Sequence, residues 1–183
     1  MQFVSLRSKI AQKVLGYFFL NEEAIMYVNE MAKKLAADKR NLVKKLKEFE
    51  SAGILSKEKR GNQRVYFLNK GYPLFDELKK VVLKTVGIEM ILRKELAKIE
   101  GLKFAYIFGS YAAGKLSAQS DIDLLVVGDF DSMELSRLIF DLEAKFNREI
   151  NAIEMDEKEY EERKSKRDAF LLNIEQGKRI QLI

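Results

Sequence analysis

Two short apolar runs, at residues 104–108 and 124–127, constrain most strongly what this chain can fold into. A continuous apolar run of this length suits a strand that is buried within a sheet. The first run stops at Gly109-Ser110, and the second begins directly after Asp121-Ile122-Asp123. We therefore expect a buried sheet in the second half of the chain, with polar residues where its strands begin and end.

Absent residue types restrict the chemistry further. The 183 residues include no cysteine, which excludes a disulfide framework, a thiolate zinc site and a cysteine nucleophile. They also include no histidine, which excludes His–metal sites and Ser–His–Asp triads. Any catalysis must come from carboxylates, hydroxyls, lysines and bound cations.

The first 20 residues predict neither a signal peptide nor a membrane span, because charged residues interrupt their apolar ones. No segment reaches about 18 uninterrupted apolar residues. We expect a cytoplasmic protein that does not contact a membrane.

Charge divides the chain into two parts. Residues 1–70 hold 15 Lys and Arg against 7 Asp and Glu, whereas the remainder holds 18 against 21. The only proline, Pro73, lies at the boundary. We predict a domain at 1–72, a connector at 73–99 and a second domain at 100–183. The basic first part favours a polyanionic partner, and the acidic second part favours bound cations.

Apolar spacing and turn residues predict the elements of the first domain. Asp38 suits a helix N-cap, Gly53 a helix C-terminus, and Gly61-Asn62 a two-residue hairpin turn. Helix, helix, helix and hairpin is the order of a winged helix-turn-helix. The predicted elements are a helix at 8–20, a strand at 24–28, helices at 29–35 and 38–53, and hairpin strands at 54–60 and 63–68.

The third helix and the hairpin are the candidate DNA-binding elements. Residues 46–55 resemble the corresponding stretch of winged-helix transcriptional regulators of the ArsR and MarR type. Such a helix enters the major groove, and the resemblance implies duplex DNA as a partner. The alternative is that these cations only solvate the helix and that the hairpin serves dimerisation or protein docking. The candidate residues are Lys39, Arg40, Asn41, Lys44 and Lys45 on the helix, with Arg60 and Arg64 beside the hairpin tip.

The connector, residues 73–99, predicts either one long helix or two helices broken near Gly87. It either packs onto both domains or forms the dimerisation helix of a homodimer.

Asp121 and Asp123 are the candidate metal ligands. Side chains alternate along a strand, so both carboxylates point to one face with Cα atoms about 7 Å apart. Adjacent carboxylates repel each other unless a divalent cation lies between them. Gly109 permits close backbone approach, and Ser110 with neighbouring amides can cradle phosphates. The arrangement fits chemistry on a nucleoside triphosphate that depends on Mg²⁺ (or Mn²⁺).

Gly109-Ser110, followed after a gap by Ser120-Asp121-Ile122-Asp123, resembles the signature of DNA polymerase β-type nucleotidyltransferases. The likeness covers residues 85–183 and is closest to the minimal prokaryotic domains, which include antitoxin partners of HEPN toxins. It implies transfer of a nucleoside monophosphate from an NTP to a hydroxyl, on a toxin-like protein or an RNA, with pyrophosphate leaving. It further implies that Asp121 and Asp123 hold two Mg²⁺ ions and that Gly109, Ser110, Lys115 and Ser120 contact the nucleotide.

Two departures from the family bear on activity. Ala113 stands where members often have Arg, although Lys115 lies nearby in the sequence. Asn151 stands where a later strand, here 148–153, usually carries a third Asp. We also predict a crossover helix at 133–146, and we interpret the charged residues 157–168 as the opening of the last helix.

The expected fold class is α+β: an N-terminal winged helix-turn-helix followed by a mixed-sheet nucleotidyltransferase domain. Two functions remain open. Asp121 and Asp123 favour an enzyme, whereas Ala113 and Asn151 favour a transcriptional regulator, antitoxin-like, whose second domain senses nucleotide or holds a dimer together.

Overall fold

The computed structural model describes residues 6–115 and 120–183. The chain divides into two compact units, Met1–Met90 and Ile91–Ile183, so the boundary falls inside the predicted connector. In the described ranges, no helix is both long and apolar enough to cross a membrane.

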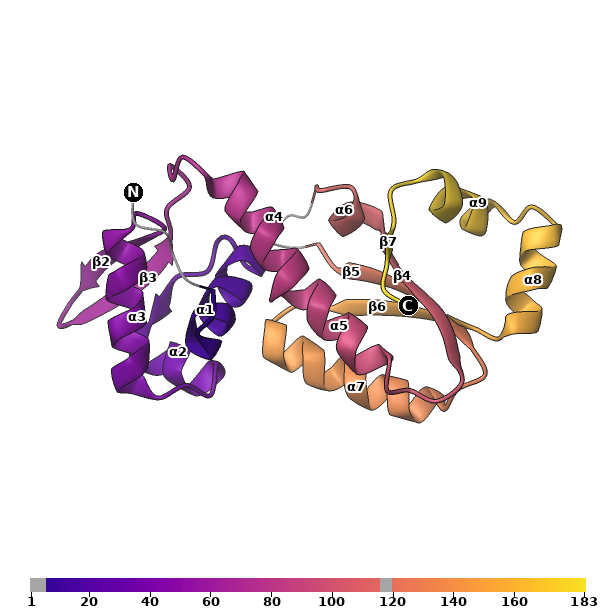
Figure 1. The fold of residues 1–183 in the computed structure, drawn as a ribbon, viewed down its shortest axis with the longest axis horizontal. Coiled ribbons are helices and arrows are strands. Elements are labelled where there is room, and N and C mark those ends of the chain that lie inside the picture. Colours follow the sequence, from indigo (N-terminus) through magenta and orange to yellow (C-terminus); the bar gives the residue numbers. More distant parts are fainter. Residues whose placement is uncertain (1–5, 116–119) are drawn as a thin grey trace. The chain divides into compact units, whose positions relative to one another are not determined.

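Unit 1 places three helices against a small antiparallel sheet (Figure 1). The strand order is β1-β3-β2. The order of elements matches the sequence prediction. The elements are α1 (Lys9–Leu20), β1 (Met26–Tyr27), α2 (Val28–Lys34), α3 (Lys39–Ser51), β2 (Leu55–Arg60), β3 (Gln63–Leu68) and α4 (Phe75–Thr85).

The sequence explains the roles of α1 and α3. All residues of α1 from Val14 to Leu20 are buried, so this helix forms the centre of the unit. Helix α3 buries only Leu42, Leu46 and Phe49. Asp38 caps it as predicted, because its carboxylate accepts a hydrogen bond from the Asn41 N–H at 2.9 Å.

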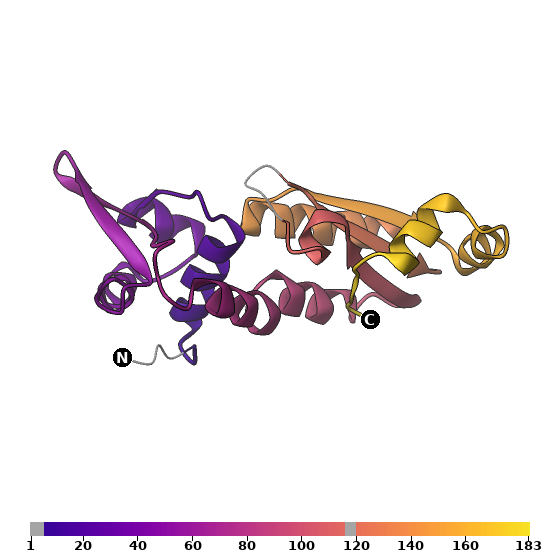
Figure 2. The same cartoon turned by 90° about the horizontal axis from the view of Figure 1, so that it is seen from above.

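The hairpin β2–β3 also follows the prediction. Arg60 pairs with Gln63 in the antiparallel register, which leaves Gly61 and Asn62 as the two turn residues. Gly61 has a φ of +60°, a conformation that glycine adopts readily. The hairpin projects away from α1, α2 and α3 (Figure 2).

The connector forms two helices rather than one. Helix α4 ends at Thr85, and α5 (Ile88–Leu96) begins after Gly87. A Cβ on Gly87 would lie 2.7 Å from the Leu83 Cα, so the backbone turns too tightly here for a side chain. Leu74, the N-cap residue of α4, and Val81, in the middle of this helix, are exposed, and the dimerisation role of this segment stays a prediction.

Unit 2 contains a four-stranded mixed sheet in the order β6-β5-β4-β7. Strands β5 and β6 are parallel and are joined by the crossover helix α7, whereas β4 runs antiparallel to β5 and β7. The expected mixed sheet is therefore present. After α5, the elements are β4 (Leu102–Phe108), α6 (Gly109–Ala112), β5 (Ile122–Gly128), α7 (Ser132–Phe146), β6 (Ile150–Met155), α8 (Glu157–Ser165), α9 (Ala169–Gln176) and β7 (Ile180–Gln181).

One face of this sheet carries a core cluster that α8 and α9 cover. Leu125 and Val127 of β5 pack there with Tyr160 of α8 and with Leu171 and Ile174 of α9. Because side chains alternate along a strand, Asp123 points to this same face, two residues before the covered part begins.

The interpretation of residues 157–168 as the opening of the last helix is wrong. These residues form a separate helix, α8, and the chain breaks at 166–168 before α9 starts. Arg167 has a φ of +54°, which ends the helical path, and Asp168 caps α9 by accepting hydrogen bonds from the N–H groups of Phe170 and Leu171.

Candidate active site

The two acidic residues lie at the start of β5. Asp121 directly precedes the strand and is exposed, and Asp123 is the second strand residue and is half-buried. Phe108 of β4 pairs with Asp123 on one side, and Asn151 of β6 pairs with it on the other. Asp123 therefore lies on the middle of three neighbouring strands, β4, β5 and β6, at one end of the sheet face that packs against α8 and α9.

Gly109 touches the Asp123 carboxylate. A Cβ at position 109 would lie 2.1 Å from Asp123 Oδ2, far closer than two non-bonded atoms approach. Gly109 also has a φ of +68°, which disfavours any other residue. The Gly-Ser turn and the carboxylates, separated by ten residues in the sequence, are thus brought into contact as the spacing predicts.

Ser110 follows within the short helix α6 and is half-buried. The carbonyl of Ser110 accepts a hydrogen bond from the Lys115 N–H at 2.9 Å, which folds the chain back after α6. Lys115 is exposed. The predicted site residues Gly109, Ser110 and Lys115 therefore lie on one turn, of which Gly109 contacts the Asp123 carboxylate.

Arg148 contacts the segment directly before the acid pair, a contact that the sequence analysis did not predict. Its side chain is buried, and its Nη1 donates a hydrogen bond to the carbonyl of Ser120 at 2.9 Å. This contact ties the start of β6 to the residue directly before Asp121. No local pattern distinguishes Arg148 from a surface arginine, because its neighbours Asn147 and Glu149 are exposed.

Asn151 occupies the position where the family resemblance places a third carboxylate. Its Nδ2 lies 3.5 Å from Asp123 Oδ1, at the outer limit of a hydrogen bond. Within residues 6–115 and 120–183, no three Asp or Glu residues are grouped so that they could hold a metal. Glu149 therefore does not complete the acid pair in this conformation.

The donor atoms present nevertheless fit a hard cation. Asp121 and Asp123 supply carboxylate oxygens, which suit Mg²⁺, whereas Asn151 turns its Nδ2 towards Asp123 and would supply an amide oxygen only after rotation of its amide group. Mg²⁺ also binds through one or two carboxylates when substrate phosphates complete its shell.

A pocket of about 510 Å³ opens beside the Gly-Ser turn. It lies between the β4–α6 turn and α9, so segments about 60 residues apart in the sequence form its walls. The apolar side chains can contact a flat base or ribose, and the lysines can contact phosphates. The lining residues are Phe108, Gly109, Ala113, Lys115, Phe170, Asn173, Ile174, Gly177 and Lys178.

The candidate DNA-binding residues belong to unit 1. Lys39, Arg40, Asn41 and Lys44 are exposed on α3. Lys45 is half-buried, forms an ion pair with Glu48 at 2.6 Å and lies 5.8 Å from the Phe49 ring centre. Arg60 and Arg64 are exposed on the hairpin, where Arg60 lies 3.4 Å from Glu58.

Known proteins resemble parts of this chain. A protein of Methanocaldococcus jannaschii described as a protein adenylyltransferase is 44% identical over 52 residues, which are 28% of this chain and 52% of that protein. The chain thus matches about half the length of this curated relative.

Two solved structures are more distant. A mutant MntA–HpeT toxin–antitoxin complex is 20% identical, with a TM-score of 0.40, over 52% of this chain and 73% of that one. A protein of Sulfolobus solfataricus described as a nucleotidyltransferase is 28% identical, with a TM-score of 0.25, over 40% of this chain and 68% of that one.

The comparison with protein families confirms the predicted nucleotidyltransferase domain in the second half of the chain. The matched segment includes the Gly109-Ser110 turn, the acid pair and α9. Residues 89–179 match the nucleotidyltransferase domain family, and this part of the chain is a nucleotidyltransferase domain.

Proposed function

We propose that this chain transfers AMP from Mg²⁺-bound ATP to a hydroxyl group of another protein, in the cytoplasm. The observation that carries the proposal is the contact between Gly109 and the Asp123 carboxylate, because it joins a phosphate-binding turn to a cation-binding acid pair. The relative described as a protein adenylyltransferase supports adenylate as the group and protein as the acceptor. A toxin-like protein is the acceptor that the family resemblance favours.

The reaction forms a bond between the acceptor oxygen and the α-phosphorus of ATP and breaks the bond to the β-phosphate, so pyrophosphate leaves. The hydroxyl proton of the acceptor passes to water. Mg²⁺ bound with ATP would polarise the reacting phosphate and neutralise charge on the leaving pyrophosphate. Asp121 and Asp123 would hold this cation beside the Gly109-Ser110 turn. The Gly109-Ser110 turn positions the remaining phosphates with its backbone N–H groups.

Labelled ATP tests the proposal. Full-length protein, Mg²⁺ and cell extract are incubated with ATP labelled either at the α-phosphate or at the γ-phosphate. Adenylate transfer labels an acceptor only from the α-label, and protease digestion, but not RNase, removes that product.

Asp121→Asn and Asp123→Asn should abolish labelling. Asp129→Asn is the matched control, because Asp129 is exposed just beyond the opposite end of β5. Labelling from the γ-phosphate, or labelling that persists in both acid-pair variants, would refute the assignment.

A second function, duplex DNA binding, is supported by unit 1. Its helices and hairpin follow the order of a winged helix, and α3 exposes Lys39, Arg40 and Lys44 away from its buried stripe. A helix of this kind reads base edges with its N-terminal residues and contacts phosphates with its lysines. We propose that unit 1 binds DNA and that unit 2 modifies the protein acceptor.

The regulator alternative predicts a different pair of results. A nucleotide sensor binds ATP, and ATP changes its affinity for DNA, but it labels no acceptor. Titration of DNA with and without Mg²⁺–ATP, run beside the labelling assay, separates the two functions.

A further inference from the structure

The pocket beside Gly109 is lined by two lysines from distant parts of the sequence. Lys115 follows α6, and Lys178 follows α9 after the cap residue Gly177. Ala113, the residue directly after α6, lines the same pocket with a single methyl group. The pocket therefore combines an open volume with two cationic groups next to the Asp123 carboxylate.

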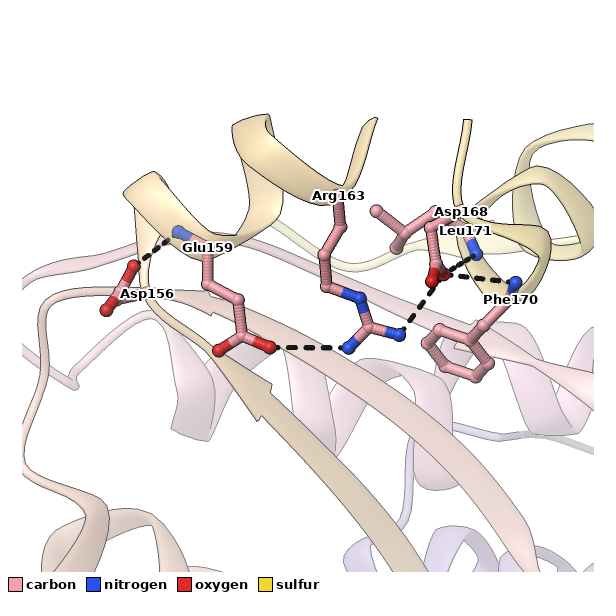
Figure 3. A network of polar contacts seen from close by, with 6 residues as sticks. All are labelled: Asp156, Glu159, Arg163, Asp168, Phe170 and Leu171. Atoms are coloured by element: carbon pink, nitrogen blue, oxygen red, sulfur yellow. Dashed lines mark hydrogen bonds and ion pairs between the residues drawn. The ribbon is translucent and has the colours of Figure 1, made fainter. Parts of the chain in front are cut away.

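Most neighbouring cations of this unit are already engaged. Arg163 of α8 lies 3.3 Å from Glu159 and 3.1 Å from Asp168, and it stacks over Phe170 (Figure 3). The hydrogen bond to Asp168 raises the pKa of Arg163 above its ordinary value. The other engaged cations are Lys164 with Glu175, Lys166 with Glu162, and Arg179 over the Tyr106 ring at 4.8 Å.

Lys178 differs from these neighbours. It is exposed and, within the described part of the chain, forms no ion pair with an acidic side chain. Lys115, which lines the pocket from the opposite segment, has no acidic partner there either. Both cations that line the pocket are thus without a carboxylate partner among the described residues.

We propose that Lys178 binds the β- and γ-phosphates of the nucleotide, together with Lys115; this inference rests on the proposed nucleotidyl transfer. A triphosphate carries more negative charge than one Mg²⁺ offsets, and Asp121 and Asp123 add two carboxylates nearby. The carboxyl end of α9 also presents partial negative charge. An ammonium group at position 178 offsets the negative charge of the triphosphate and that of the α9 carboxyl end. Its flexible side chain allows it to reach the phosphates.

Binding measurements with nucleotides of different phosphate number test this role. The full chain is titrated with Mg²⁺ complexes of ATP, ADP and AMP. Lys178→Ala should weaken ATP binding about tenfold, as expected for loss of one charged hydrogen bond, and should leave AMP binding unchanged. Lys178→Arg retains the charge and should retain the ATP affinity.

Two further variants test whether the effect depends on a positive charge inside the pocket. Lys158→Ala removes one exposed positive charge from α8, outside the pocket, and should bind ATP like the wild type. Ala113→Arg, introduced into Lys178→Ala, places a cation in the same pocket and should restore ATP affinity. Thermal unfolding of each variant verifies that the fold is kept.

The outcomes separate this inference from the proposal on which it rests. If the wild type binds none of the nucleotides, the proposed function fails and the role of Lys178 fails with it. If the wild type binds Mg²⁺–ATP but Lys178→Ala matches Lys158→Ala, the inference about Lys178 is overturned and the proposed function stands.

Discussion

Two constraints act on position 109: a φ of +68° and the Asp123 carboxylate beside its Cα. Gly109→Ala should push this carboxylate aside and lower the rate of AMP transfer roughly a hundredfold, since misplacing a reacting group by about 1 Å has such an effect. Gly114→Ala is the matched control, because Gly114 has a φ of +72° but nothing within 4 Å of its Cβ position. Equal losses of transfer rate in the two variants would show that backbone strain, not displacement of Asp123, is responsible.

The second prediction for a single residue concerns Asn151 and the rate of AMP transfer. An amide oxygen is a neutral metal ligand and cannot accept the proton of the attacking hydroxyl, so we expect the wild type to bind Mg²⁺–ATP but transfer AMP slowly. Asn151→Asp places a carboxylate next to Asp123 and should raise the single-turnover rate by roughly a hundredfold with little change in ATP affinity. Asn151→Ala should give no increase in rate.

Substitution of Glu149 tests the alternative that this residue, and not Asn151, is next to the acid pair during transfer. Glu149→Gln should leave transfer unchanged, because Glu149 is not grouped with Asp121 and Asp123 in the part of the chain that the structure describes. Fast transfer by the wild type that Glu149→Gln abolishes would make Glu149 the third ligand and would contradict the role given to Asn151.

The sequence predicted those site residues that lie on two strands adjacent both in the sequence and in the sheet. Gly109, Asp121 and Asp123 follow from spacing, because β4 and β5 are neighbours in the sheet with one short connection. Arg148 and Lys178 could not be found in this way. Arg148 hydrogen-bonds to the Ser120 carbonyl, 28 residues away in the sequence. Lys178 lines a pocket whose opposite wall is the segment around α6.

At the scale of elements, α9 depends on one carboxylate. Asp168 accepts hydrogen bonds from the N–H groups of Phe170 and Leu171 at 3.1 Å, and it pairs with Arg163. The hydrogen bond from Leu171, aided by Arg163, lowers the pKa of Asp168. Because the folded pKa lies below the unfolded value, Asp168 stabilises the fold fully above that value and loses this contribution as pH falls through the folded pKa.

Asp168→Asn tests this dependence, since asparagine keeps the capping geometry but does not titrate. The difference in denaturation midpoint between wild type and variant should be constant above about pH 5 and should shrink as the pH falls towards 2. Asp141→Asn, an exposed change on α7, should show no such dependence. A wild-type advantage over Asp168→Asn that is equal at pH 7 and pH 3 would contradict the assignment.

Element prediction succeeded where apolar spacing and cap residues agreed, as for α3 with Asp38 and for the hairpin at Gly61. It failed between α8 and α9. The sequence contains a cap signal at Asp168, but the apolar spacing of α8 is almost absent, since Tyr160 is its only buried residue. A helix held by so few apolar contacts gives little periodicity from which to place its end.

At the scale of the whole molecule, charge distinguishes the two units. Residues 1–70 carry a net charge of +8 and the remainder a net charge of −3. The sequence analysis predicts domains at 1–72 and 100–183 with a connector between them, and the two compact units of the structure divide between Met90 and Ile91. The division of labour that we propose, DNA binding in unit 1 and adenylate transfer in unit 2, follows the same boundary.

The full chain should bind duplex DNA with a steep salt dependence, because each neutralised phosphate contributes about −0.9 to the slope of log K against log salt. Lys44→Ala should flatten the slope by about one such contact. Lys45→Ala, one residue along, should change it less, since Lys45 is already paired with Glu48.

Arg40 and the hairpin cations should behave differently from each other. Arg40→Ala should alter the preference among DNA sequences if its guanidinium reaches a base edge, whereas Arg60→Ala and Arg64→Ala should weaken binding to all sequences alike. Lys158→Ala in unit 2 is the control for loss of one positive charge and should leave the slope unchanged. Absence of duplex binding by the full chain at about 50 mM salt, a concentration at which multi-phosphate contacts are strong, would refute the role assigned to α3 and the hairpin.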